Sequence, residues 1–280
     1  MKVIRNFLSK DKFKYLKNIV EDPRFPYYYQ KNLLPVKSKK WDKYDFFFCH
    51  MLFRDGLQVS GNKLVESVEN LKPIKGKSMM YFDKIKNNLI LTRTENFYAF
   101  HRGMNRFLKK KKINKLISFF MNAQPVLFKD KINWKYPGAG GFEPHQDAQV
   151  WENLYKNVKN FLSLTISINK TTEKNGCLEV AEKRHKEGLF GDNSSAIPKN
   201  IVKKFNWKKI TTRPGDLILF GAYTPHRSKK NKTNKPRKMI YLTYNAKKDG
   251  DLRNKYFKDK RKNYPPNNER IKGKKYKYLI

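Results

Sequence analysis

The chain has few cysteines and no long hydrophobic run. Its 280 residues include two cysteines, Cys49 and Cys177, which are too few for a disulfide framework and too far apart for a compact zinc site. No stretch reaches about 18 uninterrupted apolar residues, and the residues after Met1 lack the apolar segment of a signal peptide. We therefore expect reduced cysteines, no membrane span and a cytoplasmic location.

Acidic residues are also scarce. The chain has 24 Asp and Glu against 63 Lys and Arg, so its formal net charge is +39 at pH 7. Such a charge favours nucleic acid or an anionic membrane as a partner. However, 50 of the basic residues are Lys and 13 are Arg, a surplus typical of AT-rich coding, whereas proteins that recognise bases rely on Arg. A nucleic-acid-binding or nucleic-acid-modifying protein is therefore an alternative that we do not favour.

Aromatic residues are plentiful, and they indicate a folded protein. The 20 Phe and 16 Tyr supply enough apolar bulk for a packed interior. The length suits one large domain, so we expect a single domain over 1–280. We divide it into a divergent N-terminal part (1–125), a β-rich core (126–246) and a basic C-terminal extension on the surface (247–280).

Helical patterns come first along the chain and strand patterns come later. Apolar residues three and four apart predict helices over 9–20, 64–71 and 113–120. Short runs of β-forming residues predict strands over 77–81, 88–100, 126–136, 161–169, 177–180, 216–220 and 239–245. This order indicates an α+β, mainly β fold: a double-sheet jelly roll with flanking N-terminal helices and a site at its mouth.

The histidines give the metal chemistry few candidates, because the chain has five. Only His145 stands in a His-x-Asp pattern, with Asp147, and residues two apart on a strand project to the same face. His226, much later in the chain, completes a possible 2-His-1-carboxylate triad, which holds Fe(II) and leaves positions open for other ligands and O₂. The alternatives are an Asp that caps a turn beside a surface His, and an exposed loop histidine in a basic patch.

Arg237 follows His226 at a short distance in the sequence, just before a predicted strand. A guanidinium group matches a carboxylate bidentately, so Arg237 could bind the far end of a dicarboxylate whose near end chelates the iron. Ser228 could donate its hydroxyl to the same carboxylate. This pattern predicts 2-oxoglutarate as the cosubstrate.

Five stretches, in this order, resemble the phytanoyl-CoA dioxygenase family of Fe(II)/2-oxoglutarate oxygenases. They are 129–135, 141–147, 175–180, 213–216 and the segment from His226 through Arg237. The resemblance implies a double-stranded β-helix (cupin-like) core and catalysis with Fe(II), 2-oxoglutarate and O₂. It implies three iron ligands, namely His145, Asp147 and His226. For 2-oxoglutarate it implies Arg237 and Ser228, with Asn133 and Lys131 as further candidates.

Within the family, three further stretches are similar to bacterial hydroxylases of 2-aminoethylphosphonate and related aminophosphonates. These stretches are 93–97, 255–261 and 264–267. We therefore expect a small, anionic substrate, with 2-aminoethylphosphonate as the leading candidate. The N-terminal segment 1–75 departs from this subgroup. A third interpretation is a metal-binding β-barrel without oxygenase activity, and the complete triad with Arg237 counts against it.

Overall fold

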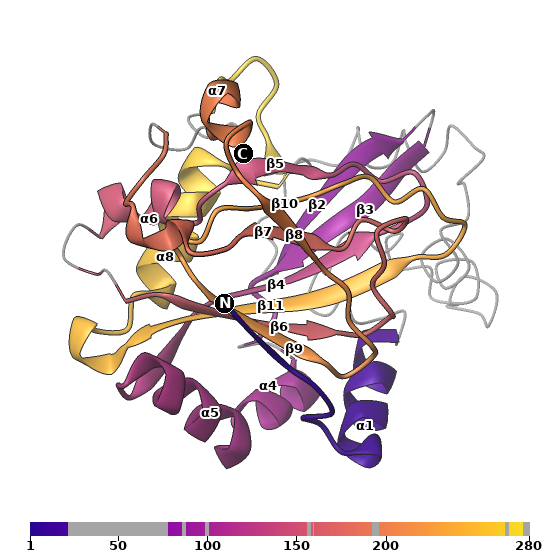
Figure 1. The fold of residues 1–280 in the computed structure, drawn as a ribbon, viewed down its shortest axis with the longest axis vertical. Helices are drawn as coiled ribbons and strands as arrows, with labels where there is room; N and C mark the ends of the chain where they lie inside the picture. The colour runs from indigo at the N-terminus through magenta and orange to yellow at the C-terminus, as the bar shows by residue number, and fades with distance from the viewer. Residues whose placement is uncertain are drawn as a thin grey trace, which may run out of the picture.

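The computed structural model describes residues 1–21, 78–85, 88–98, 101–155, 158, 160–191, 196–266 and 269–276. Two antiparallel sheets form the body of this part of the chain (Figure 1). The larger sheet has seven strands in the order β1-β9-β6-β11-β4-β3-β2, and the smaller has four in the order β5-β10-β7-β8. This arrangement confirms the predicted double-stranded β-helix core and the mainly β class.

The two sheets are built from strands of very different length. The larger sheet comprises β1 (Lys2–Ile4), β2 (Met79–Ile85), β3 (Asn88–Glu95), β4 (Pro125–Lys135), β6 (Leu162–Ser167), β9 (Leu217–Gly221) and β11 (Arg237–Ala246). The smaller sheet comprises β5 (Phe142–His145), β7 (Leu178–Ala181), β8 (Trp207–Ile210) and β10 (His226–Ser228). The strands predicted from 77 to 100 and from 126 onward are therefore present, with shifted ends.

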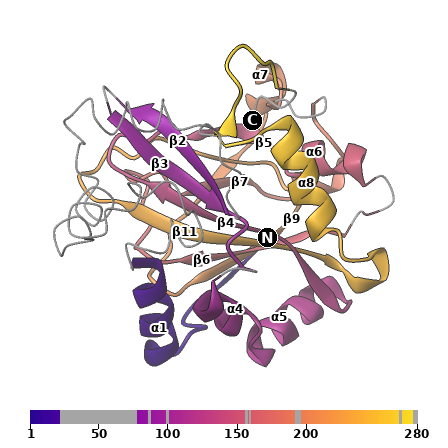
Figure 2. The ribbon, with the colours of Figure 1, turned by 180° about the vertical axis from the view of Figure 1, so that it is seen from behind.

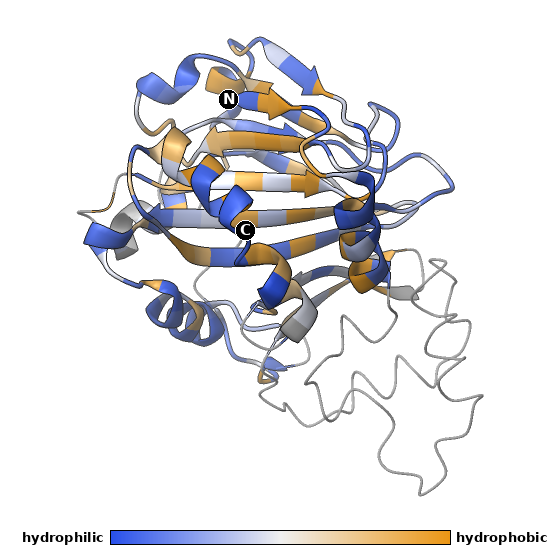
Figure 3. Ribbon diagram, turned by 90° about the horizontal axis from the view of Figure 1, so that it is seen from below, coloured by the Kyte–Doolittle hydropathy of each residue, from blue (hydrophilic) through white to orange (hydrophobic). Residues whose placement is uncertain are grey.

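Strand β9 shows how the core is divided, because it is buried on both faces. Leu217 and Leu219 pack in the cluster that contains the helices, whereas Ile218 and Phe220 pack between the two sheets. The period of two along a strand produces this alternation. In Figure 3, hydrophobic and hydrophilic residues are likewise interspersed along the strands. The interior between the sheets is the space in which a ligand site can form.

Three N-terminal helices cover the outer face of the larger sheet (Figures 1 and 2). They are α1 (Lys10–Glu21), α4 (Arg102–Leu108) and α5 (Lys111–Met121). The first and third confirm the predictions over 9–20 and 113–120, whereas the helix predicted over 64–71 lies outside the described residues. Helix α4 was not predicted; its N-terminus is capped by His101, whose Nδ1 accepts the Met104 N–H at 3.1 Å.

Strand β3 ends at Glu95, earlier than the predicted strand over 88–100. Asn96 has a φ of 59°, in the left-handed region, and this backbone conformation cannot continue a strand. The Asp130 carboxylate then accepts the next two backbone N–H groups, from Phe97 at 2.7 Å and Tyr98 at 3.0 Å. The buried Asp130 side chain thus replaces a neighbouring strand as the hydrogen-bond acceptor, and the strand ends there.

The C-terminal extension contributes to the interior, although the sequence predicted that it lies on the surface. Helix α8 (Arg253–Asn263) packs against β4 and buries Tyr256 and Phe257. Its Lys260 pairs with buried Glu95 at 2.5 Å. The basic residues that suggested a solvated tail are thus partly used to neutralise buried acids. The division of the chain at residues 125 and 246 stays a prediction.

None of the helices in the described residues has the length and apolar character needed to cross a bilayer. The cytoplasmic location stays a prediction. The other short elements are α6 (Ala148–Leu154), α7 (Lys199–Val202) and the 3₁₀ turns η2 (Arg184–Lys186) and η3 (Lys247–Asp249).

Candidate active site

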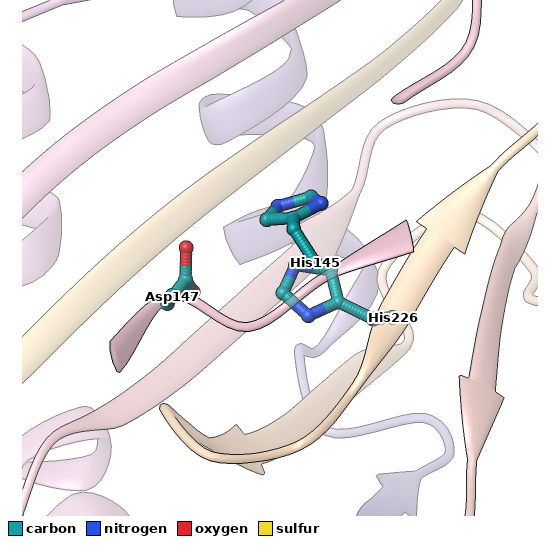
Figure 4. A group of neighbouring side chains, drawn as sticks. All are labelled: His145, Asp147 and His226. Atoms are coloured by element: carbon teal, nitrogen blue, oxygen red, sulfur yellow. The ribbon is translucent and has the colours of Figure 1, made fainter. Parts of the chain in front are cut away.

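Two strands of the smaller sheet, and the turn that follows one of them, bring together three residues that were predicted as metal ligands. His145 ends β5 and His226 begins β10, and the two are direct partners in the antiparallel pairing of these strands. Their ring centroids lie 4.3 Å apart. Asp147 lies beside them, and candidate ligand atoms of all three residues are within 4.8 Å of one another (Figure 4). The two histidines and the carboxylate predicted from the sequence therefore form one cluster.

Both imidazoles are held by the same kind of hydrogen bond. The Nδ1 of His145 lies 2.6 Å from the backbone carbonyl of Glu143, and the Nδ1 of His226 lies 2.9 Å from that of Thr224. A carbonyl oxygen can only accept, so Nδ1 carries the proton and Nε2 keeps its lone pair. Metal-binding histidines are commonly oriented in this way by an outer hydrogen bond. The donor set of two Nε2 atoms and one carboxylate fits Fe(II).

Asp147 does not lie on the same strand as His145, contrary to the sequence argument. Strand β5 ends at His145, and Asp147 occupies the N-cap position of α6 with helical backbone angles. Its carboxylate makes no capping hydrogen bond, so the alternative of a turn-capping Asp is wrong. The cluster forms because the chain turns sharply between β5 and α6, and the carboxylate remains available as a ligand.

Gln146 fixes this turn, and the sequence analysis assigned it no role. Its side chain is buried and donates to the carbonyls of Gly188 and Tyr223, both at 2.8 Å. Its Oε1 accepts the Phe190 N–H at 2.9 Å. Because Tyr223 lies shortly before His226, Gln146 ties the turn that carries Asp147 to the segment that leads to His226. No sequence pattern distinguishes this glutamine from a surface one.

The charges around the cluster favour the protonation states that a metal requires. Burial, reinforced by the neighbouring His226, lowers the pKa of His145 to about 3. Burial also lowers the pKa of His226. Burial alone would raise the pKa of Asp147, but His226 and Lys129 hold it below its ordinary value. At neutral pH the imidazoles are therefore neutral and the carboxylate is ionised, as ligands must be.

A second group of residues lies between the sheets, around Arg237. Arg237 is buried, and its Nη2 donates to the Gly176 carbonyl at 3.0 Å while its Nη1 lies 2.9 Å from the weakly accepting Sδ of Met239. Its Nε is buried without a hydrogen-bond partner. Ser228 is also buried and lies on β10, the strand that carries His226. A guanidinium with an unused donor suits the distal carboxylate of 2-oxoglutarate.

A cavity beside the triad is lined by four basic side chains: Arg93, Lys129, Lys131 and Lys260. The first and last share the buried carboxylate of Glu95, at 3.1 and 2.5 Å. Although burial alone would raise the pKa of Glu95, Lys260 and Arg93 hold it below its ordinary value. This pair of ion pairs fixes one wall of the cavity.

The other two cations, Lys129 and Lys131, lie over aromatic rings. The Nζ of Lys131 is 4.8 Å from the Tyr241 ring centroid, and that of Lys129 is 5.5 Å from the Trp151 ring centroid. Within the described part of the chain, neither has a carboxylate at ion-pair distance. Burial, reinforced by Lys129, lowers the pKa of Lys131 to about 7. The cavity therefore has an excess of positive charge beside the triad.

Comparison with known proteins decides the family. The profile of the family described as phytanoyl-CoA dioxygenase matches residues 3–239 of the chain. The chain belongs to the phytanoyl-CoA dioxygenase family. It is accordingly a 2-oxoglutarate-dependent dioxygenase, and the third interpretation, a β-barrel without oxygenase chemistry, is set aside. A nucleic-acid-binding or nucleic-acid-modifying protein stays an alternative that we do not favour.

Two relatives of this dioxygenase have names that refer to phosphonates. A 2-aminoethylphosphonate dioxygenase from an uncultured bacterium is 39% identical over 204 residues, which cover 72% of this chain and 77% of the relative. A methylphosphonate hydroxylase from Gimesia maris is 36% identical over 189 residues, which cover 67% of this chain and 71% of the relative. Both similarities agree with the predicted subgroup.

Solved structures support the fold. The crystal structure of EctD from S. alaskensis with 2-oxoglutarate and 5-hydroxyectoine has a TM-score of 0.61 to the dioxygenase at 16% identity. It covers 89% of this chain and 72% of that chain. At this identity the likeness shows a shared fold.

The remaining predicted residues, Lys131 and Asn133, lie on one face of β4 together with two lysines that were not predicted. Lys129, Lys131, Asn133 and Lys135 alternate along this strand, so their side chains project to the same side. Lys131 lines the cavity beside the triad and does not contact Arg237 or Ser228 in any recorded hydrogen bond, whereas Lys135 contacts Ser228 at 2.8 Å. Asn133 is buried between these two lysines, with its Oδ1 unpartnered.

Lys129 and Lys135 were not predicted as site residues from the sequence. The signal for both was present, because the spacing Lys129-x-Lys131-x-Asn133-x-Lys135 places polar residues on one strand face while Ile132 and Trp134 face the apolar core. Lys260 could not be found in this way, because its place in the cavity depends on the packing of α8.

Proposed function

We propose that this dioxygenase binds Fe(II) through His145, Asp147 and His226 and hydroxylates a small phosphonate such as 2-aminoethylphosphonate. Bound Fe(II), together with 2-oxoglutarate and O₂, would supply the oxidation of a substrate C–H bond. Carbonyl oxygens of Glu143 and Thr224 orient the two imidazoles. Arg237 and Ser228 would hold the distal carboxylate of 2-oxoglutarate, so that its other end reaches the metal.

The substrate class rests mainly on Lys129 and Lys131. These two half-buried lysines line the same cavity as His145 and Asp147, and both lie over aromatic rings. In the described residues, neither has a carboxylate at ion-pair distance. A phosphonate group presents several acceptor oxygens and up to two negative charges, which would compensate both lysines. The names of the two relatives support the same class.

The proposal also offers a place for an amino group. Besides Asp147, Asp259 of α8 is the acidic side chain that lines the cavity, and its Oδ1 accepts from Asn263 at 2.8 Å. An ammonium group at the far end of an aminophosphonate could be attracted to this carboxylate. This favours 2-aminoethylphosphonate over methylphosphonate as the substrate.

The test measures succinate formation from 2-oxoglutarate with Fe(II) and O₂. The panel contains 2-aminoethylphosphonate, methylphosphonate and two analogues with a single negative charge on the acid group, taurine and β-alanine. We expect 2-aminoethylphosphonate to stimulate succinate formation most and the single-charge analogues to have little effect. Equal stimulation by taurine and 2-aminoethylphosphonate, or none by any phosphonate, would reject the substrate class while leaving the family unaffected.

Variants of Lys129 and Lys131 test whether these two lysines bind the phosphonate group. Lys129→Met and Lys131→Met should each raise the KM for the phosphonate by about 10- to 100-fold, the usual loss for one charge-assisted hydrogen bond. The affinity for 2-oxoglutarate should change little. Lys115→Met, on the exposed face of α5, is the matched control and should behave like the wild type.

A further inference from the structure

Two buried basic side chains face each other between the sheets. Lys135 on β4 is the direct partner of Arg237 on β11, and the two residues are 3% and 1% exposed. The Nζ of Lys135 donates to Ser228 Oγ at 2.8 Å and to the Lys229 carbonyl at 2.6 Å. The hydrogen-bond acceptors of both side chains among the described residues are neutral. In the described residues, no carboxylate lies within ion-pair distance of either one.

The two cations meet at one carbonyl oxygen. The Gly176 oxygen accepts from Arg237 Nη2 at 3.0 Å and lies 3.5 Å from Lys135 Nζ. Burial, reinforced by the positive charge of Arg237, lowers the pKa of Lys135 to about 6. Burying two like charges without an anion is unfavourable. Without an anion Lys135 is therefore mostly uncharged at neutral pH, and an anion bound beside both side chains would hold it in its charged form.

The hydrogen-bond donors point to the position of such an anion. In its charged form Lys135 can only donate to Ser228 Oγ, so an anion that keeps this lysine protonated also leaves the hydroxyl proton of Ser228 free to be donated elsewhere. The Nε of Arg237 is also a buried donor without an acceptor. Three donors from three strands, β4, β10 and β11, thus surround one small region.

We infer that Lys135 is a second cationic ligand for the distal carboxylate of the cosubstrate, and that it makes the site selective for 2-oxo diacids. The inference rests on the proposed function, which assigns this carboxylate to Arg237 and Ser228. One carboxylate would accept from the guanidinium, the ammonium and the hydroxyl, and it would compensate both buried charges. Lys131, the lysine expected at this place from the sequence, lines the other cavity instead.

Gly176 is required for this arrangement. Its φ is +71°, which strongly favours glycine, and a Cβ there would lie 2.0 Å from the Lys229 carbonyl oxygen and 3.0 Å from Lys135 Nζ. Any side chain would therefore displace the lysine or the backbone that holds it. The close contacts and the positive φ thus explain why a glycine stands at position 176.

The experiment compares two ligands that differ only at the distal end. 2-Oxoglutarate and 2-oxopentanoate have five carbons and the same chelating head, but the second ends in a methyl group. Their affinities for the Mn(II)-loaded protein are measured by calorimetry under anaerobic conditions. Lys135→Met should weaken 2-oxoglutarate binding by about 10- to 100-fold and leave 2-oxopentanoate binding within about two-fold of the wild type. Lys115→Met serves as the control for loss of a lysine.

A purely structural role for Lys135 predicts a different result. Lys135→Met would then weaken both ligands equally, or would leave 2-oxoglutarate binding unchanged, and either outcome overturns the inference. Lys135→Gln keeps a donor toward Ser228 without the charge and provides the same comparison if the Met variant does not fold. If the wild type itself binds no 2-oxoglutarate, the proposed function fails and the inference fails with it.

Discussion

The carboxylate of Glu95 should be the most important single charge for the stability of the cavity wall. Glu95 is fully buried, and it pairs with Lys260 at 2.5 Å and with Arg93 at 3.1 Å. Glu95→Gln keeps the shape but leaves two buried cations without an anion. Removing one partner of a buried ion pair costs about 3–5 kcal/mol. An unfolding entropy of about 2.1 cal/mol/K per residue converts this loss, for 280 residues, into a Tm decrease of about 5–9 °C.

A surface ion pair of the same type provides the control. Glu173 and Lys209 lie 2.6 Å apart, but their side chains are 59% and 43% exposed. Glu173→Gln therefore makes the same chemical change in solvent, where such a pair contributes about 0–1 kcal/mol. Differential scanning calorimetry of the two variants isolates the effect of burial. A Glu95→Gln variant that melts within about 2 °C of Glu173→Gln would refute the reasoning.

The difference in stability between wild type and Glu95→Gln should depend on pH in a definite direction. The pKa of Glu95 is lower in the folded protein than its ordinary value of about 4.3 in the unfolded chain. The stabilisation is therefore fully present above about pH 5, and it is lost as the pH falls through the folded pKa. The gap between wild type and Glu95→Gln should narrow as the pH falls below about 4, where Glu95 becomes protonated in the unfolded chain. A gap that widens at low pH would contradict the assignment.

Two further predictions concern the metal site and the glycine at the cation pair. Asp147→Ala should abolish Fe(II) binding in equilibrium dialysis and all succinate formation, whereas Asp259→Ala, on the same cavity, should retain the metal; equal binding by both variants would reject Asp147 as a ligand. Gly176→Ala should lower the free energy of unfolding in urea by more than Gly250→Ala, because both have positive φ (+71° and +89°) but only the first has atoms within 4 Å of the new Cβ. Equal losses in the two glycine variants would show that the contact at Gly176 relaxes without cost.

The sequence predicted the long strands and the chemistry of the site better than the smaller sheet. Strands β5 and β10 have only four and three residues, and β5 contains Pro144, which argues against a strand. The structure tolerates this proline because β5 is at the edge of its sheet. Short polar strands gain their stability from neighbours far away in sequence, so a local pattern could not predict them. The triad could still be predicted, because the prediction used the residue types and their spacing in the sequence and did not require the correct strand boundaries.

The position of Asp147 and the role of α8 illustrate the same limit. The alternation rule placed Asp147 on the strand face of His145, whereas the structure brings it there through a turn held by buried Gln146. The basic C-terminal residues suggested a solvated surface, yet Lys260 lies against buried Glu95. In both cases the deciding contacts join segments that are far apart in the sequence. By contrast, the period-two lysines of β4 were visible in the sequence and could have been assigned.

Strand β4 carries residues of both proposed ligand sites on one continuous backbone. Lys131 lines the triad cavity and Lys135 contacts Ser228, and the extended strand between them separates their Cα atoms by about 13 Å. This separation is set by covalent geometry and by pairing with β11 and β3, so no loop movement can alter it. The strand thus keeps the distance between the two sites constant. Adaptation to a longer or shorter substrate would have to occur on the opposite wall, where α8 contributes Asp259 and Lys260.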